Sequence, residues 1–301
     1  MTDSIAVGVD AGGTATVAAL SRGGRLQAKV SGGPANPSSL GTSAAAAEIV
    51  AAVRRLTQGV DADAVFVAAA GAGRDDAREA LLVSLRSAFP HTAHLAVEDD
   101  TRVALRAALP AGPGIVVIAG TGSVAYAENG SSRVRAGGAG YLLGDEGSAF
   151  AIGLAALKLL ARVYDGRASS DETTELAARA FDAPNRDTLV AAVYGGPLDV
   201  ARIAALAPNI IRFADQGNRV STKIVQTAAQ ELGDLARVAA RQSGLHDASP
   251  SVVFAGGLLR ENSLLSFLLE TRITNEIPGA AVVRLRDEPA QAALRFAEAL
   301  L

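Results

Sequence analysis

Residues 7–20, VGVDAGGTATVAAL, place an acid at the mouth of a glycine turn between two apolar runs. The runs predict strands over 5–10 and 14–20, joined by the AGG turn. Such a turn exposes backbone N–H groups that can bind phosphate oxygens, and Thr14 adds a hydroxyl donor. Asp10 would repel a bound polyphosphate unless its carboxylate holds Mg²⁺, directly or through water. Taken alone, the stretch fits an ordinary hairpin with a turn-favouring aspartate better.

A second copy of the pattern weakens that simpler interpretation. Residues 114–130, GIVVIAGTGSVAYAENG, again combine a strand, a glycine turn and a strand. A third glycine pair follows the apolar run in VVFAGGLL, residues 252–259. The first turn carries Asp10 where the second carries Ala119, which suggests a duplicated domain with the active site between the copies. Neither GxxxxGK[ST] nor GxGxxG occurs, so a P-loop and a Rossmann fingerprint are not supported.

The wider pattern predicts an α/β protein of two domains, with the boundary at LPAGPG, residues 109–114. The first domain is expected over 1–110 and the second over 111–288, the latter enlarged by mostly helical sequence. A terminal helix over 289–301 is expected to pack back on the first domain. Further strands are predicted over 25–30, 64–71, 94–98, 133–136, 251–259 and 280–285, and further helices over 42–57, 74–89, 99–109, 145–164 and 218–244.

Composition excludes several classes of function. The net charge of −3 and the absence of a basic block argue against nucleic acid as a partner. The chain has no cysteine, so it offers no disulfide and no thiolate metal site, and its three scattered histidines do not suggest zinc. With no basic leader in the first ten residues and no apolar run of spanning length, we expect a cytoplasmic protein without a membrane partner. The predicted helices over 171–243 leave a homodimer as an option, although such stripes more often face an intramolecular core.

Three consecutive acids, Glu98, Asp99 and Asp100, stand where a predicted strand meets a predicted helix. Acids at this position cap the helix and complement its dipole, which explains at least one of them. One of the three could instead serve as a general base, which contributes about 10²–10⁴-fold to a rate. In phosphoryl transfer most of the remaining rate acceleration comes from positioning and neutralisation of charge, so no covalent intermediate is required. Local spacing does not decide which acid is the base.

Two further loops carry polar residues among glycines or prolines. In GAGYLLGDEGSAFAIG, residues 138–153, Asp145 and Glu146 suit recognition of sugar hydroxyls, or Asp145 simply caps the following helix. In SGGPANPSSLG, residues 31–41, Asn36 lies between two prolines in a surface or binding loop.

These motifs together resemble those of the sugar kinase, Hsp70 and actin superfamily. VGVDAGGTATVAAL is similar to its first phosphate motif, GIVVIAGTGSVAYA to its second, and VVFAGGLLREN to its adenosine motif. GAGYLLGDEGSAFAIG resembles the N-acetylglucosamine kinase branch, which includes glucosamine kinases and the BadF/BadG/BcrA/BcrD-type ATPases. The resemblance implies two ribonuclease-H-like domains around a cleft that closes on ATP and a sugar.

The resemblance also implies site residues. Asp100 matches the catalytic base and a sugar contact, and Asp10 the residue that organises Mg²⁺. Asn36 and Asp145 match contacts to the amino sugar. The matching nucleotide contacts are Gly12, Gly13, Thr14, Thr121, Gly122, Ser123, Gly256 and Gly257, of which Thr121 and Gly122 also match sugar contacts.

Some residues depart from the pattern of that family. Charged residues, Glu98 and Asp99, precede the base, and they either raise a pKa or cap the helix. The chain has no tryptophan to line an N-acetyl pocket, so the sequence slightly favours a free amine while leaving glucosamine and N-acetylglucosamine open. The absence of cysteine ligands for an iron–sulfur cluster argues against a reductase activator.

We therefore predict a kinase that transfers phosphate from MgATP to the 6-hydroxyl of glucosamine or N-acetylglucosamine. The alternatives are a kinase of another hexose and a non-catalytic ATP- or sugar-sensing protein on the same fold.

Overall fold

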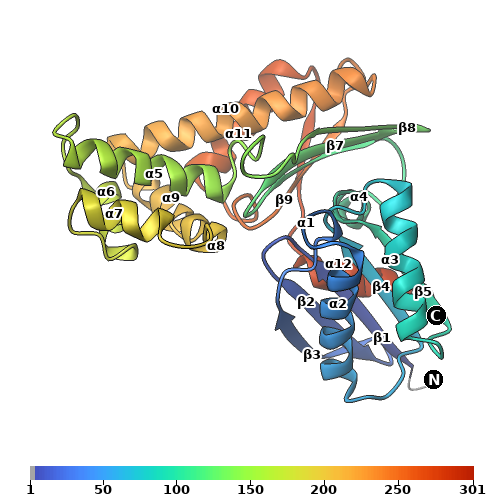
Figure 1. Ribbon diagram of the computed structural model, residues 1–301. Coiled ribbons are helices and arrows are strands. Elements are labelled where there is room, and N and C mark those ends of the chain that lie inside the picture. Colours follow the sequence, from blue (N-terminus) through green and yellow to red (C-terminus); the bar gives the residue numbers. More distant parts are fainter. Residues whose placement is uncertain (1–3) are drawn as a thin grey trace. The chain divides into compact units, whose positions relative to one another are not determined.

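The computed structural model of the chain describes residues 4–301 (Figure 1). Residues 1–3, part of the stretch for which no signal peptide is expected, lie outside the described residues. The chain forms two compact units, one from the residues up to Pro110 together with Arg286–Leu301, the other from Ala111–Leu285. Each unit contains one mixed sheet of five strands. The expected α/β class with two related sheets is therefore confirmed.

The first unit has the strand order β3-β2-β1-β4-β5. Strand β1 pairs antiparallel with β2 and parallel with β4, which in turn pairs parallel with β5. The strands are β1 (Ile5–Ala11), β2 (Thr16–Arg22), β3 (Arg25–Gly32), β4 (Ala64–Ala69) and β5 (His94–Asp99). The helices are α1 (Pro37–Leu40), α2 (Thr42–Thr57), α3 (Asp75–Ala88), α4 (Asp100–Ala108) and, from the end of the chain, α12 (Pro289–Glu298).

Successive side chains of β1 point to opposite sides of the sheet, and both sets are buried. Val7 and Val9 belong to one core cluster, which includes residues of α2 and α3. Ala6 belongs to a second cluster on the other face, which includes residues of α12. Asp10 has the same parity as Ala6, so it continues the face that α12 covers.

Helix α12 approaches the backbone of β1 very closely at Gly8. A Cβ atom at Gly8 would lie 2.0 Å from the backbone nitrogen of Leu294. The rings of Phe66 and Phe296 stack with centroids 5.1 Å apart, and Ser21 Oγ donates a hydrogen bond of 2.6 Å to Glu298. These contacts attach the end of the chain to its first strands.

The second unit has the strand order β10-β9-β6-β7-β8. Its strands are β6 (Gly114–Ala119), β7 (Ser123–Asn129), β8 (Ser132–Gly137), β9 (Ser251–Ala255) and β10 (Ala281–Arg284). Its helices are α5 (Ala149–Tyr164), α6 (Glu172–Ala180), α7 (Arg186–Tyr194), α8 (Val200–Ala204), α9 (Ala207–Asp215), α10 (Arg219–Gln242) and α11 (Leu264–Glu276). The long α10 contacts β6, β7 and β8, and α5 through α11 supply most of one large core.

Two local predictions differ from the structure. Helix α5 begins after Ser148, whose side chain accepts a hydrogen bond of 3.1 Å from the Ala151 backbone nitrogen, so Asp145 is not its cap. Asp145 instead has a left-handed backbone, with φ of 60°. Helix α11 occupies a stretch between two strands for which no element is predicted.

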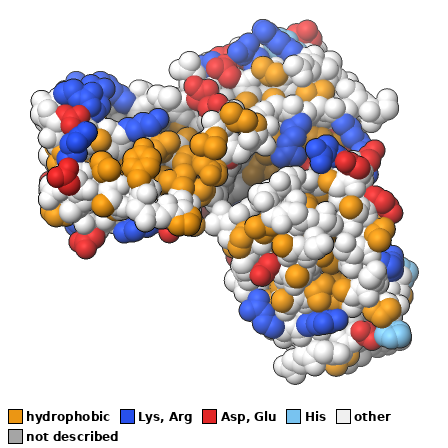
Figure 2. All heavy atoms as spheres, in the orientation of Figure 1, with side chains coloured by type: hydrophobic (Ala, Val, Ile, Leu, Met, Phe, Trp, Pro, Cys, Tyr) orange, Lys and Arg blue, Asp and Glu red, His pale blue; other side chains and the backbone are white. Residues whose placement is uncertain are grey.

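No helix within residues 4–301 is long and apolar enough to cross a membrane. Figure 2 shows hydrophobic side chains on the visible face of the helical part of the second unit. The exposed hydrophobic residues at and after α7 include Val190, Tyr194 and Leu198. A homodimer stays a prediction.

Candidate functional site

The candidate site residues of the first unit gather at the carboxyl ends of its parallel strands. Asp10, Ala68 and Glu98 are in register across β1, β4 and β5, and Asp100 follows two residues after Glu98. In open α/β sheets this edge is where ligands bind. The strand register therefore places Asp10 and the acids of the β5–α4 junction at the same edge of the sheet, on strands separated by β4.

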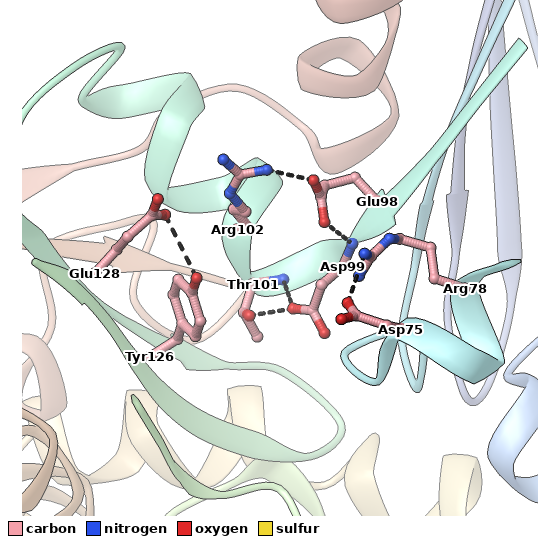
Figure 3. A network of polar contacts seen from close by, with 8 residues as sticks. All are labelled: Asp75, Arg78, Glu98, Asp99, Thr101, Arg102, Tyr126 and Glu128. Carbon is pink, nitrogen blue, oxygen red and sulfur yellow. Dashed lines mark hydrogen bonds and ion pairs between the residues drawn. The ribbon is translucent and has the colours of Figure 1, made fainter. Parts of the chain in front are cut away.

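Figure 3 shows the contacts of Glu98 and Asp99, the first two of the three acids at the β5–α4 junction. Glu98 forms an ion pair with Arg102 one helical turn later. Asp99 is buried and caps α4, because its Oδ1 accepts hydrogen bonds from the Thr101 backbone nitrogen, at 2.9 Å, and from the Thr101 hydroxyl. The cap and the ion pair give Glu98 and Asp99 structural roles. Asp100 is the first residue of the helix, and its Oδ1 also accepts a hydrogen bond of 2.9 Å from the Thr101 backbone nitrogen.

Asp10 and Asp100 are close enough to affect each other's charge. Burial raises the pKa of Asp10 to about 7, and the charge of Asp100 adds to the increase. Both effects disfavour the ionised carboxylate, as expected for a desolvated acid beside a like charge. A cation would reverse this preference, so the pair fits a role for Asp10 in organising Mg²⁺.

The first glycine turn divides its backbone groups between structure and a ligand. Gly12 donates its N–H to the Ala15 carbonyl at 3.0 Å and accepts from the Ala35 N–H at 3.0 Å. A Cβ atom at Gly12 would lie 2.8 Å from the Ala15 oxygen, so this glycine shapes the turn. Within the described residues, no hydrogen bond is recorded for the backbone nitrogens of Gly13 and Thr14. These are the donors that the turn can offer to phosphate.

The loop that contains Asn36 also reaches this edge of the sheet. Asn36 begins the short helix α1, and its Oδ1 accepts a hydrogen bond of 2.8 Å from the Ser38 backbone nitrogen. Its Nδ2 lies 3.9 Å from the position that a Cβ of Gly13 would take. Asn36 is therefore beside the first glycine turn.

The second unit brings a different acid to the second glycine turn. A Cβ atom at Gly122 would lie 2.8 Å from Asp145 Oδ1, and the Ser123 backbone nitrogen donates to that oxygen at 3.1 Å. Burial raises the pKa of Asp145, while the hydrogen bond from Ser123 and the charge of Arg135 oppose the increase. The Asp145 carboxylate on this turn can accept a hydrogen bond from a hydroxyl ligand.

The remaining groups of the second turn differ in availability. Ser123 donates its hydroxyl to the Glu146 carbonyl at 2.6 Å, and the Gly120 nitrogen donates to the Gly122 carbonyl at 2.9 Å. In residues 4–301 no hydrogen bond is recorded for the backbone nitrogens of Thr121 and Gly122. The loop contact of Ser123 was not predicted, and its expected contact to phosphate stays a prediction.

The third glycine pair lies directly after β9, beside the end of β6. Gly256 has φ of 87°, and a Cβ atom there would lie 2.3 Å from the Ala119 carbonyl oxygen. The Leu258 nitrogen donates to the same oxygen at 3.1 Å. Gly256 thus joins the predicted adenosine motif to the second turn, and Gly257 has open space around its Cα.

The predicted residues therefore form one group in each unit. The first contains Asp10, Gly12, Gly13, Thr14, Asn36 and Asp100, and the second contains Thr121, Gly122, Ser123, Asp145, Gly256 and Gly257. Within residues 4–301 no three acid or histidine side chains cluster as metal ligands. Mg²⁺ typically binds through one or two carboxylates and keeps water and phosphate oxygens as its other ligands.

Two residues near Asn36, Ser38 and Gly71, are absent from the predicted set. Ser38 donates its hydroxyl to the Gly71 carbonyl at 3.2 Å. The sequence signal for Gly71 is a glycine that ends the apolar run AVFVAAAG, two residues after the end of β4.

Comparisons with known proteins point in one direction. An N-acetylmuramic acid/N-acetylglucosamine kinase from Clostridium acetobutylicum is 26% identical over 241 residues, 79% of this chain and 78% of that protein. An N-acetyl-D-glucosamine kinase from Dictyostelium discoideum is 26% identical over 315 residues, 99% of this chain and 98% of that protein.

Solved structures agree on the fold. A proposed N-acetylglucosamine kinase from Chromobacterium violaceum has a TM-score of 0.75 and 25% identity, covering 97% of this chain and 98% of that one. A ROK family glucokinase from Streptomyces griseus, with glucose and AMPPNP, has a TM-score of 0.62 at 19% identity, covering 98% and 99% of the two chains. The expected two-domain sugar kinase and actin-like fold is thereby confirmed. The BadF/BadG/BcrA/BcrD ATPase family matches residues 7–294, so the chain belongs to that family.

Proposed function

We propose that the protein is a kinase that transfers the γ-phosphoryl group of ATP to the 6-hydroxyl of an amino sugar, N-acetylglucosamine or glucosamine. The observation that carries this proposal is the proximity of Asp10 and Asp100 at the carboxyl edge of the first sheet, where the charge of Asp100 contributes to raising the pKa of Asp10. Two acids at one edge suit phosphoryl transfer, because one can hold the metal and the other can accept the proton of the acceptor hydroxyl.

Asp100 would accept the proton of the 6-hydroxyl as its oxygen attacks the γ-phosphorus. Its place at the first position of α4 favours an anionic side chain, because the helix N-terminus carries partial positive charge. The contacts of Glu98 and Asp99 hold the junction in place, and the Thr101 backbone nitrogen donates a hydrogen bond of 2.9 Å to Asp100 Oδ1. In this proposal Asp100 is the residue that touches the acceptor.

The backbone donors of the two glycine turns would bind the phosphate oxygens. Gly13 and Thr14 offer theirs in the first unit, and Thr121 and Gly122 in the second. When bound, Mg²⁺ neutralises the charge that develops on the transferred group. Asp10 would hold the ion, and the cation in turn would keep Asp10 ionised despite its burial.

The sugar is assigned from hydroxyl-accepting groups and from the names of the relatives. Asp145 offers carboxylate oxygens beside Gly122, and Asn36 offers an amide beside the first turn. The two curated relatives are named for N-acetylated sugars, which favours N-acetylglucosamine over the free amine that the sequence slightly favours. A cytoplasmic location fits the use of ATP.

The test is sugar-dependent ADP release from MgATP with glucose, glucosamine, N-acetylglucosamine and N-acetylmannosamine, with and without EDTA. The proposal requires the highest kcat/KM for one of the two glucosamine sugars, phosphate at carbon 6 of the product, and loss of turnover in EDTA. Binding of ATP or sugar without sugar-dependent ADP release would identify a sensing protein instead. A preference for glucose would identify a hexose kinase.

A further inference from the structure

The side-chain amide of Asn36 has one defined orientation. Its Oδ1 accepts a hydrogen bond of 2.8 Å from the Ser38 backbone nitrogen, and a backbone nitrogen can only donate. The oxygen and nitrogen of the amide therefore cannot exchange places without losing that bond. Nδ2 consequently points to the side of Gly13, where the first turn offers its donors.

Gly71 leaves the space that this orientation needs. A Cβ atom at Gly71 would lie 2.2 Å from Asn36 Oδ1 and 2.7 Å from Ser38 Oγ. Separations under 3.0 Å do not occur for real Cβ atoms, so any larger residue would displace the Asn36 side chain, the Ser38 side chain or both. The Ser38 hydroxyl also donates to the Gly71 carbonyl at 3.2 Å, which ties the two loops together.

We propose that Gly71 and Ser38 are positioning residues that hold the Asn36 amide so that the sugar meets its N–H donors. This inference rests on the proposed function, because it assumes that Asn36 contacts the sugar. Neither residue is required to touch the ligand. An N–H donor fixed in this way recognises an acceptor oxygen on the sugar, whereas a rotated amide would present its carbonyl and lose that hydrogen bond.

The experiment compares Gly71→Ala with Gly59→Ala in the full chain. Gly59 is a matched control because its φ of 82° is close to the 84° of Gly71, while a Cβ there would meet nothing within 4 Å. Both variants carry the same backbone strain, and Gly71→Ala alone crowds Asn36. Ser38→Ala is the milder second variant, since it removes one hydroxyl and cannot clash.

In kinetics, Gly71→Ala is expected to raise the KM for the sugar about tenfold, the effect of one lost oriented hydrogen bond. Its kcat and its KM for ATP stay near the wild-type values, and Gly59→Ala changes none of the three. Ser38→Ala shifts the sugar KM in the same direction by a smaller factor. The double variant Gly71→Ala/Asn36→Ala matches Asn36→Ala alone, because the glycine acts through the asparagine.

Two outcomes overturn the inference: equal effects of Gly71→Ala and Gly59→Ala, or effects of Gly71→Ala and Asn36→Ala that multiply in the double variant. Crystal structures of the two glycine variants without ligand add a readout that needs no turnover. Asn36 should be displaced in Gly71→Ala and unchanged in Gly59→Ala, and an unmoved Asn36 in both refutes the positioning role. If wild-type protein phosphorylates no sugar, the proposed function fails while these structures still decide the positioning.

Discussion

At the scale of the residue, three adjacent acids differ in their surroundings. Glu98 forms an ion pair with Arg102, and Asp99 caps α4. Asp100 contributes to the raised pKa of Asp10. Sequence spacing could not make this assignment, since the direction of each side chain depends on where β5 ends and α4 begins.

Asp100→Asn is expected to lower kcat by about 10²–10⁴-fold, the usual contribution of a general base. ATP binding, measured by calorimetry, should stay near the wild-type value. Asp99→Asn is the matched control, because asparagine caps a helix about as well as aspartate does. Retained turnover in Asp100→Asn, or an equal loss in Asp99→Asn, would refute Asp100 as the base.

The raised pKa of Asp10 predicts a dependence of stability on pH in metal-free protein. Half of the Asp10 carboxyl groups are protonated in the folded state at about pH 7, whereas in the unfolded chain the group ionises near its ordinary pKa of 3.8. The contribution of Asp10 to the free energy of unfolding is therefore fully present below about pH 4 and is lost as the pH rises to about 7. Asparagine does not ionise, so Asp10→Asn should not lose stability as the pH rises. Its free energy of unfolding, measured in urea with EDTA, should exceed that of wild type by an amount that grows from pH 5 to 7 and then levels off.

A second variant tests whether the charge of Asp100 contributes to the raised pKa of Asp10. Asp100→Asn removes the neighbouring charge, so the window in which wild-type stability falls should move to lower pH. Added Mg²⁺ should stabilise wild type more at pH 8 than at pH 5 and should have less effect on Asp10→Asn. A flat difference between Asp10→Asn and wild type across the range would contradict the raised pKa.

At the scale of the element, most strands and helices follow from hydrophobic pattern and turn chemistry. The two strand–glycine turn–strand units are found where the sequence predicts them, as β1–β2 and β6–β7. Helix α11 escaped prediction because its apolar residues do not keep to one face. Leu265, Leu269 and Ile273 are buried, yet Phe267 is 64% exposed. Pattern alone cannot assign a helix of this kind.

The candidate site was less accessible to sequence reasoning than the fold. The glycine turns and acids are visible as motifs, but the division of their backbone donors is not. Gly12 uses its N–H within its own turn, and Ser123 gives its hydroxyl to the 146 carbonyl. Such contacts depend on loops whose conformations are set by tertiary packing, as is the space at Gly71.

The start of α5 provides a test that separates a cap from a ligand-binding acid. Ser148→Ala should lower the free energy of unfolding by about 1 kcal/mol, because the helix loses the cap on the Ala151 nitrogen. Asp145→Asn keeps an oxygen for the Ser123 nitrogen and should leave stability nearly unchanged while raising the sugar KM. Urea unfolding and steady-state kinetics on both variants measure this contrast, and a loss of stability confined to Asp145→Asn would restore Asp145 as the cap.

At the scale of the whole molecule, the last residues of the chain belong to the same compact unit as the first ones. Residues from both ends build the first unit, while the second unit is one continuous segment. The hydrophobic clusters follow the same division. One cluster consists of residues of the second unit, and the other two consist of residues of the first unit. Packing of α12 on β1 is therefore a contact that closes the first unit, and its tightest point is Gly8.

Gly8→Ala should destabilise the first unit selectively. The added Cβ would lie 2.0 Å from Leu294 N and 2.3 Å from Leu294 Cα, and backbone atoms cannot rotate away, so α12 must shift. Overpacking of this kind typically costs about 1–3 kcal/mol. Gly196→Ala is the control, because a Cβ there meets nothing within 4 Å and no positive φ is involved.

Hydrogen exchange shows which unit loses that free energy. In Gly8→Ala the buried amides of Val7 and Val67 should exchange faster, while those of Val116 and Phe254 in the second unit keep their rates. Separate cores make this the expected result, because the opening of one need not expose the other. An equal acceleration at all four amides would mean that both units unfold as one cooperative body, and that α12 stabilises the whole chain rather than the first sheet.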